Sequence, residues 1–170
     1  GALVEFEYAV PLMDDELRES IHASLSPCSE QEFYTAYEQA HFKKYLEDYH
    51  LAKESAKSDI NVILGIEIRF TEAGNDYLVF GIDEDELEFY AELTPYGIEN
   101  FYKEAKNERN VIIQAHPFRK GVTLAPPSSI DGIEAYNLHP VHNQQNALTA
   151  RYAREHDFLV TGGSDFHHVT

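Results

Sequence analysis

The chain has a single cysteine, Cys28, and lacks any long apolar run, and both shortages exclude classes of protein. One cysteine cannot form a disulfide within the chain, so a scaffold held together by internal disulfides is excluded. No apolar stretch approaches the roughly 20 residues that a membrane-spanning helix needs. A signal peptide is also not recognisable. We therefore expect a cytoplasmic protein with no role in a membrane.

Basic residues are also scarce, because 13 Lys and Arg stand against 30 Asp and Glu, for a formal net charge of -17. This excess of negative charge opposes an extended surface for nucleic acid or anionic lipid. An anionic ligand would need local help from metal ions or from placed Arg and Lys side chains. The Gly-rich phosphate loop that ends in Lys-Ser/Thr is absent, as is the G-x-S-x-G motif, so we expect neither nucleotide switching nor serine hydrolysis.

What the chain does have is a series of short apolar runs and helical patterns that can bury one core. Its 170 residues, 43% of them hydrophobic, predict a single domain over 1–170. The predicted strands are 3–10, 62–68, 77–80, 111–115, 132–136 and 158–160. The predicted helices are 29–57, a helix that starts at Thr94 and Pro95, and 143–156. This order is typical of α/β folds with parallel strands.

Charged and imidazole side chains occur at or near the carboxyl ends of three predicted strands. Glu67 lies inside one apolar run, His116 follows the next, and Asp165 and His167 follow the last. A carboxylate between isoleucines is costly to bury unless it is paired, for example in a salt bridge to Arg69, or bound to a cation. Since the ends of parallel strands meet at one edge, we expect a shared site. Carboxylates and imidazoles together suit Zn, Mn or Fe better than Mg alone.

Four successive motifs resemble those of the PHP (polymerase and histidinol phosphatase) domain superfamily. They are GIEIR at 65–69, AHPFR at 115–119, GIEAYN at 132–137 and GSDFH at 163–167. The resemblance implies a distorted (β/α)7 barrel, in this chain incomplete, whose strand ends bind two or three divalent metal ions. By this likeness Glu67, His116, Asp165 and His167 are both metal ligands and catalytic residues.

The first third of the chain departs from the family pattern. PHP domains open on a His-x-His strand end, where this chain has Ser-Ile-His at 20–22, and their Thr-Asp-His motif is represented only by Gln-Ala-His at 39–41. By the resemblance, His22 and His41 are further metal ligands; the alternative is that both are ordinary surface or helix histidines. Either the site is degenerate, or part of the family's domain is missing from this chain.

Several polar residues near the motifs are candidate substrate contacts. Arg119 and Arg69 follow proposed ligands closely and could clamp a phosphate group, although a solvated surface position suits Arg69 nearly as well. Asn137 and Glu134 lie at a fourth strand end and could line the pocket through hydrogen bonds. His139 and His142 are too weak a metal signal alone and are left as substrate contacts.

The resemblance implies a metal-dependent phosphoesterase in which a metal-activated water attacks a phosphate ester. The expected partner is a small phosphorylated substrate or a nucleotide, and the sequence does not predict an oligomeric state. Two alternatives stay open. One is a degenerate PHP module that binds metal or a partner without turnover, and the other is a metal-dependent hydrolase of a nonphosphate substrate.

Overall fold

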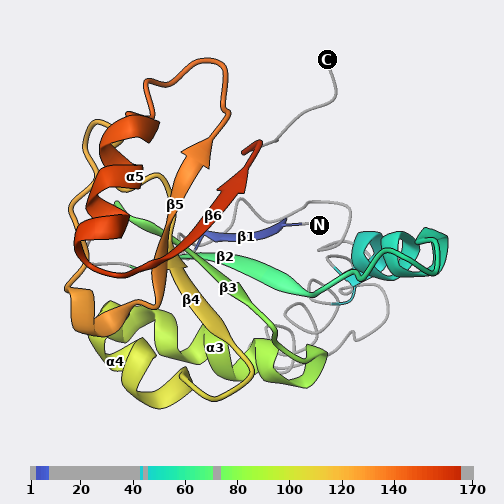
Figure 1. Cartoon of the computed structure of the whole chain (residues 1–170). Coiled ribbons are helices and arrows are strands. Elements are labelled where there is room, and N and C mark those ends of the chain that lie inside the picture. Colours follow the sequence, from blue (N-terminus) through green and yellow to red (C-terminus); the bar gives the residue numbers. More distant parts are fainter. Residues whose placement is uncertain (1–2, 8–42, 44–45, 71–73, 166–170) are drawn as a thin grey trace.

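The computed structural model describes residues 3–7, 43, 46–70 and 74–165. This part of the chain forms one six-stranded sheet in the order β1-β2-β3-β4-β5-β6. The strands are β1 (Leu3–Glu7), β2 (Gly65–Arg69), β3 (Asp76–Phe80), β4 (Val111–Gln114), β5 (Gly132–Asn137) and β6 (Leu159–Gly163). In Figure 1, α3 (Leu87–Leu93) and α4 (Gly97–Ala105) lie below the sheet, and α5 (Asn146–Glu155) lies beside β5 and β6.

The directions of the strands show that the sheet is mixed. Strand β3 is antiparallel to both β2 and β4, whereas the β1–β2, β4–β5 and β5–β6 pairs are parallel. Only six residues separate Arg69 from Asp76, too few for a parallel crossover of about a dozen residues, so the chain turns back as a hairpin.

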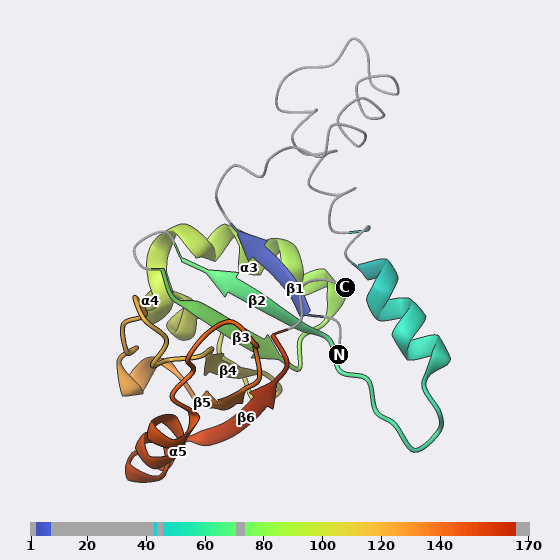
Figure 2. The ribbon, with the colours of Figure 1, turned by 90° about the horizontal axis from the view of Figure 1, so that it is seen from above.

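The prediction of a distorted (β/α)7 barrel is therefore wrong. Within the described residues, β1 and β6 are the two edges of an open sheet, and no pairing joins them. Figure 2 shows the strands following one another in sequence order from β1 to β6. A barrel would have required every strand to be followed by a crossover, and the β2–β3 and β3–β4 pairs do not meet this requirement.

Alternating side chains give the sheet two different faces, because neighbouring residues of a strand point to opposite sides. Ile66, Val79, Ile112 and Ile133 belong to the main hydrophobic core. The opposite face carries a smaller cluster of Leu78, Ile113 and Ala115. By register, Glu67 lies opposite Leu78 and therefore shares the second face. The strands thus separate a packed apolar layer from a face that holds polar residues.

The helices cover the apolar face. Helix α4 contributes the buried side chains of Ile98, Phe101 and Ala105, whose spacing follows the helical repeat. The helix predicted to start at Thr94 instead opens as a 3-10 turn, Thr94–Tyr96, and becomes α-helical at Gly97, which has φ 77°. Helix α3 was not predicted. Among the described residues, none of the helices has the length and apolar character to cross a membrane.

Of the predicted helix over 29–57, residues 46–55 are described and helical. Tyr49 from this segment is buried in the main core. Figure 2 shows the helix to one side of the sheet. The other predicted elements shift by a few residues: the strand expected over 62–68 begins at Gly65, and the helix expected over 143–156 spans Asn146–Glu155.

Candidate metal centre

Three acidic or imidazole side chains from three adjacent strands meet at one edge of the sheet. Glu67 lies on β2, Asp76 begins β3, and His116 follows β4 by two residues. Because β3 runs opposite to its neighbours, its first residue lies at the edge where β2 and β4 end. The backbone N–H of Ala115 donates to the carbonyl oxygen of Asp76 at 2.9 Å, which fixes the end of β4 beside the start of β3.

The ligand atoms of these residues are close enough to share an ion. One ligand atom from each of the three side chains lies within 4.8 Å of the other two, and all three residues are buried. Nε2 of His116 is 3.4 Å from Oδ2 of Asp76 and 3.9 Å from Oε1 of Glu67. Two ligands bound about 2.1 Å from a tetrahedral Zn²⁺ ion lie about 3.4 Å apart, so the observed spacing is close to that of a coordination sphere.

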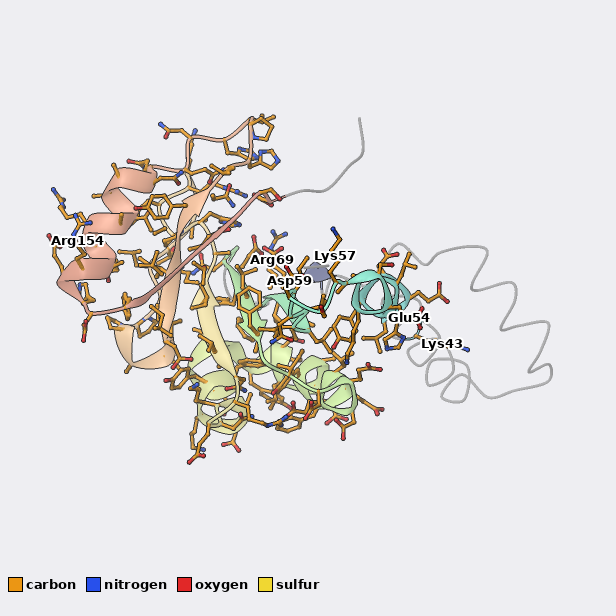
Figure 3. All side chains as sticks on the ribbon, turned by 45° about the vertical axis from the view of Figure 1, so that its right-hand side comes forward. Lys43, Glu54, Lys57, Asp59, Arg69 and Arg154 are labelled. Carbon is orange, nitrogen blue, oxygen red and sulfur yellow. The ribbon has the colours of Figure 1, made fainter. Side chains whose placement is uncertain are left out.

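Arg69 holds the Asp76 carboxylate in a bidentate pair. Its Nε donates to Oδ1 at 2.6 Å and its Nη2 donates to Oδ2 at 2.9 Å. Burial alone would raise the pKa of Asp76, but the hydrogen bonds from His116 and Arg69 outweigh it and hold the pKa below its ordinary value of 3.8. Asp76 is therefore a carboxylate at neutral pH. Arg69, which Figure 3 labels, is thus a partner of Asp76.

His116 has an unusual backbone and an imidazole nitrogen without a partner. Its φ is 30°, in the left-handed region that residues other than glycine rarely adopt. Its backbone N–H donates to Oε2 of Glu134 at 3.1 Å, which supports this conformation. The side chain is only 3% exposed, and no described residue hydrogen-bonds its Nδ1. Strained backbone and an unsatisfied buried nitrogen are both features that cluster at functional sites.

A second polar group adjoins this centre through Glu134. Nδ2 of Asn137 donates to Oε2 of Glu134 at 3.0 Å and to Oδ2 of Asp165 at 3.2 Å, and Arg119 forms an ion pair with Asp165. Burial would raise the pKa of Asp165, but the hydrogen bonds from Arg119 and Asn137 lower it. Asp165 also has a positive φ, 51°. The network places Asp165 on the same side of the sheet as His116.

The residues predicted from sequence are thus placed in three ways. Glu67 and His116 lie in the centre itself. Asp165, Arg119 and Asn137 form the adjoining network, and Arg69 pairs with Asp76. His22, His41 and His167 lie outside the described residues. The catalytic and substrate-binding roles assigned to these residues stay predictions.

Sequence reasoning missed Asp76, and it treated Glu134 only as a residue lining the pocket. Asp76 precedes an apolar run instead of following one, so a search for the carboxyl ends of strands passed over it. The short connection of 70–75 was the available signal, because a hairpin brings the first residue of the second strand beside the last residue of the first. Glu134 stands inside an apolar strand in the same way as Glu67.

Comparison with known proteins gives one family match. Residues 1–49 match the model of the anti-CRISPR protein AcrIC5 family. The match covers less than a third of the 170 residues, so it describes a similarity of the N-terminal segment. No curated protein matches the chain.

This match corrects the resemblance to the PHP superfamily, because no PHP family is found. The expected metal-dependent phosphoesterase and the wider assignment to hydrolases are wrong with it, since both rested on that likeness. The four motifs are five or six residues long. Two of them are strands β2 and β5, and the other two lie at or just after the ends of β4 and β6. Many sheets share this pattern, so short strand-end motifs do not identify a family on their own.

Proposed function

We propose that the protein binds a divalent metal ion through Glu67, Asp76 and His116. The observation that carries the proposal is the convergence of three buried ligand atoms within 4.8 Å of one another. Two buried carboxylates here face one buried imidazole, and oxygen and nitrogen donors of these kinds are the ligands that divalent transition metals and zinc prefer. The proposed cofactor is still a divalent metal ion, as the sequence predicts. Its ligands differ, because the proposed set includes Asp76 and leaves out Asp165 and His167.

The charge of the polar cluster supports a dication. Four carboxylates, those of Glu67, Asp76, Glu134 and Asp165, are grouped with two guanidinium groups. These six described groups carry a net charge of -2 when His116 is neutral. A divalent ion balances this charge without protonating His116, whose neutral imidazole is the form that binds metal. Two oxygen donors and one nitrogen donor favour Zn²⁺, Mn²⁺ or Fe²⁺.

The competing interpretation is a purely structural cluster in which a protonated His116 forms ion pairs with Asp76 and Glu67. It predicts no affinity for metal at neutral pH. Isothermal titration with Zn²⁺ and with Mn²⁺ separates the two interpretations. We expect about one ion per chain in the parent protein and a loss of at least about tenfold in affinity in Glu67→Gln, which keeps the shape of the side chain and removes its charge.

A matched control comes from an exposed pair on the surface. Nε2 of His50 lies 2.7 Å from Oε1 of Glu84, so the same two side-chain types meet outside the site. Glu84→Gln removes the same charge and should leave metal affinity unchanged. If the parent binds no ion, or if the two variants lose affinity equally, the metal centre is not at Glu67. It stays a prediction that the protein is an enzyme. It also stays a prediction that its ligand is a small phosphorylated compound or a nucleotide.

A second candidate function rests on the family match. We propose that the chain inhibits a CRISPR–Cas system through residues 1–49, the segment similar to the anti-CRISPR protein AcrIC5 family. The net charge of -17 favours a partner with a basic surface, since such charge speeds association with a partner of opposite sign.

Phage plaque counts on cells with an active CRISPR–Cas system, with and without the expressed chain, test this candidate. Restored plaques across any of a panel of systems support inhibition, and unchanged plaque counts across the panel contradict it. The Glu67→Gln variant is measured in parallel. Inhibition by both proteins would show that the metal centre and the inhibition are separate properties of the chain.

A further inference from the structure

A cavity of about 520 Å³ opens beside the polar cluster, between the end of β5 and the start of α5. Residues 137–139 and 142–148 line it. Among these described lining residues there is no Asp or Glu, although the chain has 30 acidic residues. The lining is instead rich in amide and imidazole side chains. On a protein with a net charge of -17, a cavity whose described lining has no carboxylate is a place where an anion meets little local repulsion.

The first turn of α5 contributes directly to this cavity. The ten-residue helix begins at Asn146, and both Asn146 and Ala147 line the hollow. Gln145 at the N-cap makes no side-chain capping bond, and the first turn holds no acidic residue. The side chain of Asn146 bonds the backbone of Asn137 and is therefore turned toward β5. The backbone N–H of Leu148 already donates to the carbonyl oxygen of Gln145 at 2.9 Å, so the N–H groups of Asn146 and Ala147 are the ones at this helix end without a partner inside the helix. The helix dipole adds positive potential there.

Gln144 provides an independent observation that points to a ligand. This lining residue is only 6% exposed, and no described residue hydrogen-bonds its Nε2. Its Oε1 accepts a hydrogen bond from Nε of Arg119 at 3.0 Å. That bond fixes the amide orientation, because the reverse orientation would set two donors against each other. Nε2 is thus a buried donor that still needs an acceptor, which costs free energy until one binds.

Two histidines of the lining add further N–H donors. The rings of His139 and His142 lie 4.7 Å apart between centroids. Nδ1 of His139 accepts a hydrogen bond from the backbone of Val141, so a neutral ring carries its proton on Nε2. Burial first, and then the positive charges of Arg119 and His139, lower the pKa of His142. Asp165, a carboxylate of the adjoining network, is paired with Arg119.

From these donors we propose that the cavity binds a small oxyanion, with Nε2 of Gln144 and the backbone N–H groups of Asn146 and Ala147 as its main contacts. Phosphate and carboxylate share the required chemistry, since both offer several charged oxygen acceptors to converging N–H groups. The site does not depend on the metal proposal, because neither Gln144 nor α5 contributes a ligand to the metal centre. Its test is therefore made on metal-free protein.

The test is a calorimetric titration of resin-stripped protein with inorganic phosphate and, separately, with butyrate, at constant ionic strength. Saturable binding of either anion supports the site. The anion that binds more tightly shows whether the site prefers a phosphate or a carboxylate. Ala147→Glu places a carboxylate in the first turn of α5 at an exposed position. It should weaken anion binding by at least about tenfold while keeping or raising Tm, because a negative charge there stabilises the helix.

Gln144→Met removes the buried donor and keeps the size of the side chain, and we expect about a three- to tenfold loss of affinity. Arg154→Gln is the control. It removes a positive charge from the other end of the same helix, at the outward position that Figure 3 labels, and should change affinity less than twofold. No saturable binding of either anion to the parent overturns the proposal. Equal losses in Arg154→Gln and Ala147→Glu overturn it too, because they would indicate only nonspecific attraction.

Discussion

Metal-dependent stabilisation that is lost in His116→Asn is the sharpest consequence of the proposed centre. Asparagine tolerates the left-handed backbone of residue 116, where φ is 30°, so the substitution removes the imidazole without new backbone strain. It also removes a buried Nδ1 that lacks a described partner. Leaving such a nitrogen unsatisfied costs about 1–3 kcal/mol, and losing the ring's packing costs on the order of 1–2 kcal/mol. The two terms oppose each other, but the variant also loses the hydrogen bond from His116 to Asp76, so the metal-free variant should melt below the parent. Each protein is therefore compared with its own metal-free form.

Binding to the folded state raises its stability by mass action. At a metal concentration one hundred times Kd, the gain is about 2.7 kcal/mol. Each kcal/mol corresponds to about 2–4 °C in a chain of this size, so Tm of the parent should rise by about 5–11 °C. Losing a group that merely orients a ligand costs about 10–100-fold in affinity, so losing His116 itself should cost at least about 100-fold. The gain at the same metal concentration then falls to about 0.4 kcal/mol, or about 1 °C.

Scanning calorimetry of the parent and of His116→Asn, each with and without Zn²⁺, measures all four values. His156→Asn, at an exposed position beyond α5, is the control and should keep the full metal-dependent rise. A parent Tm that does not respond to Zn²⁺ or Mn²⁺ would refute the reasoning. So would an equal rise in parent and His116→Asn, because the ion would then bind elsewhere.

Three further predictions concern the fold around the centre. Asp165 has a lowered pKa, so its contribution to metal-free stability is present above pH 3.8 and is lost as pH falls through the pKa of the folded state. In urea unfolding, the free energy of unfolding should therefore fall less steeply with decreasing pH in Asp165→Asn than in the parent. Gly132→Ala should cost more than about 1 kcal/mol, because a Cβ there would collide with the Leu159 carbonyl oxygen, whereas Gly74→Ala meets nothing and should change unfolding by less than about 0.5 kcal/mol. Phe101→Ala should cost about 3–5 kcal/mol in urea unfolding, since its side chain is fully buried.

The strands and the core were accessible from sequence because apolar runs have a direct physical meaning. The runs around Ile66, Ile112 and Ile133 are buried strands as predicted, and the stripe of Ile98, Phe101 and Ala105 covers the sheet. Strand direction was not accessible from the runs themselves. It depended on the length of the connections, and the six-residue connection before Asp76 was decisive.

The candidate site could be predicted from sequence only in part, because the direction of β3 was not predicted. Glu67 and His116 follow the rule that polar residues at strand ends converge, and the structure brings them together. Asp76 lies at the start of a strand and not at its end. Because β3 is antiparallel to β2, this first residue lies beside the last residue of β2. Arg69 was expected at a phosphate but pairs with Asp76, a contact set by hairpin register that no motif records. The short motifs misled on family because they report strand ends and not topology.

Anomalous diffraction from crystals soaked in Zn²⁺ is the sharpest test of metal binding by Glu67, Asp76 and His116, because it locates the ion without reference to activity. We expect one strong peak about 2.0–2.2 Å from Nε2 of His116 and from carboxylate oxygens of Glu67 and Asp76. A peak between His139 and His142, or no peak within bonding distance of His116, would contradict it.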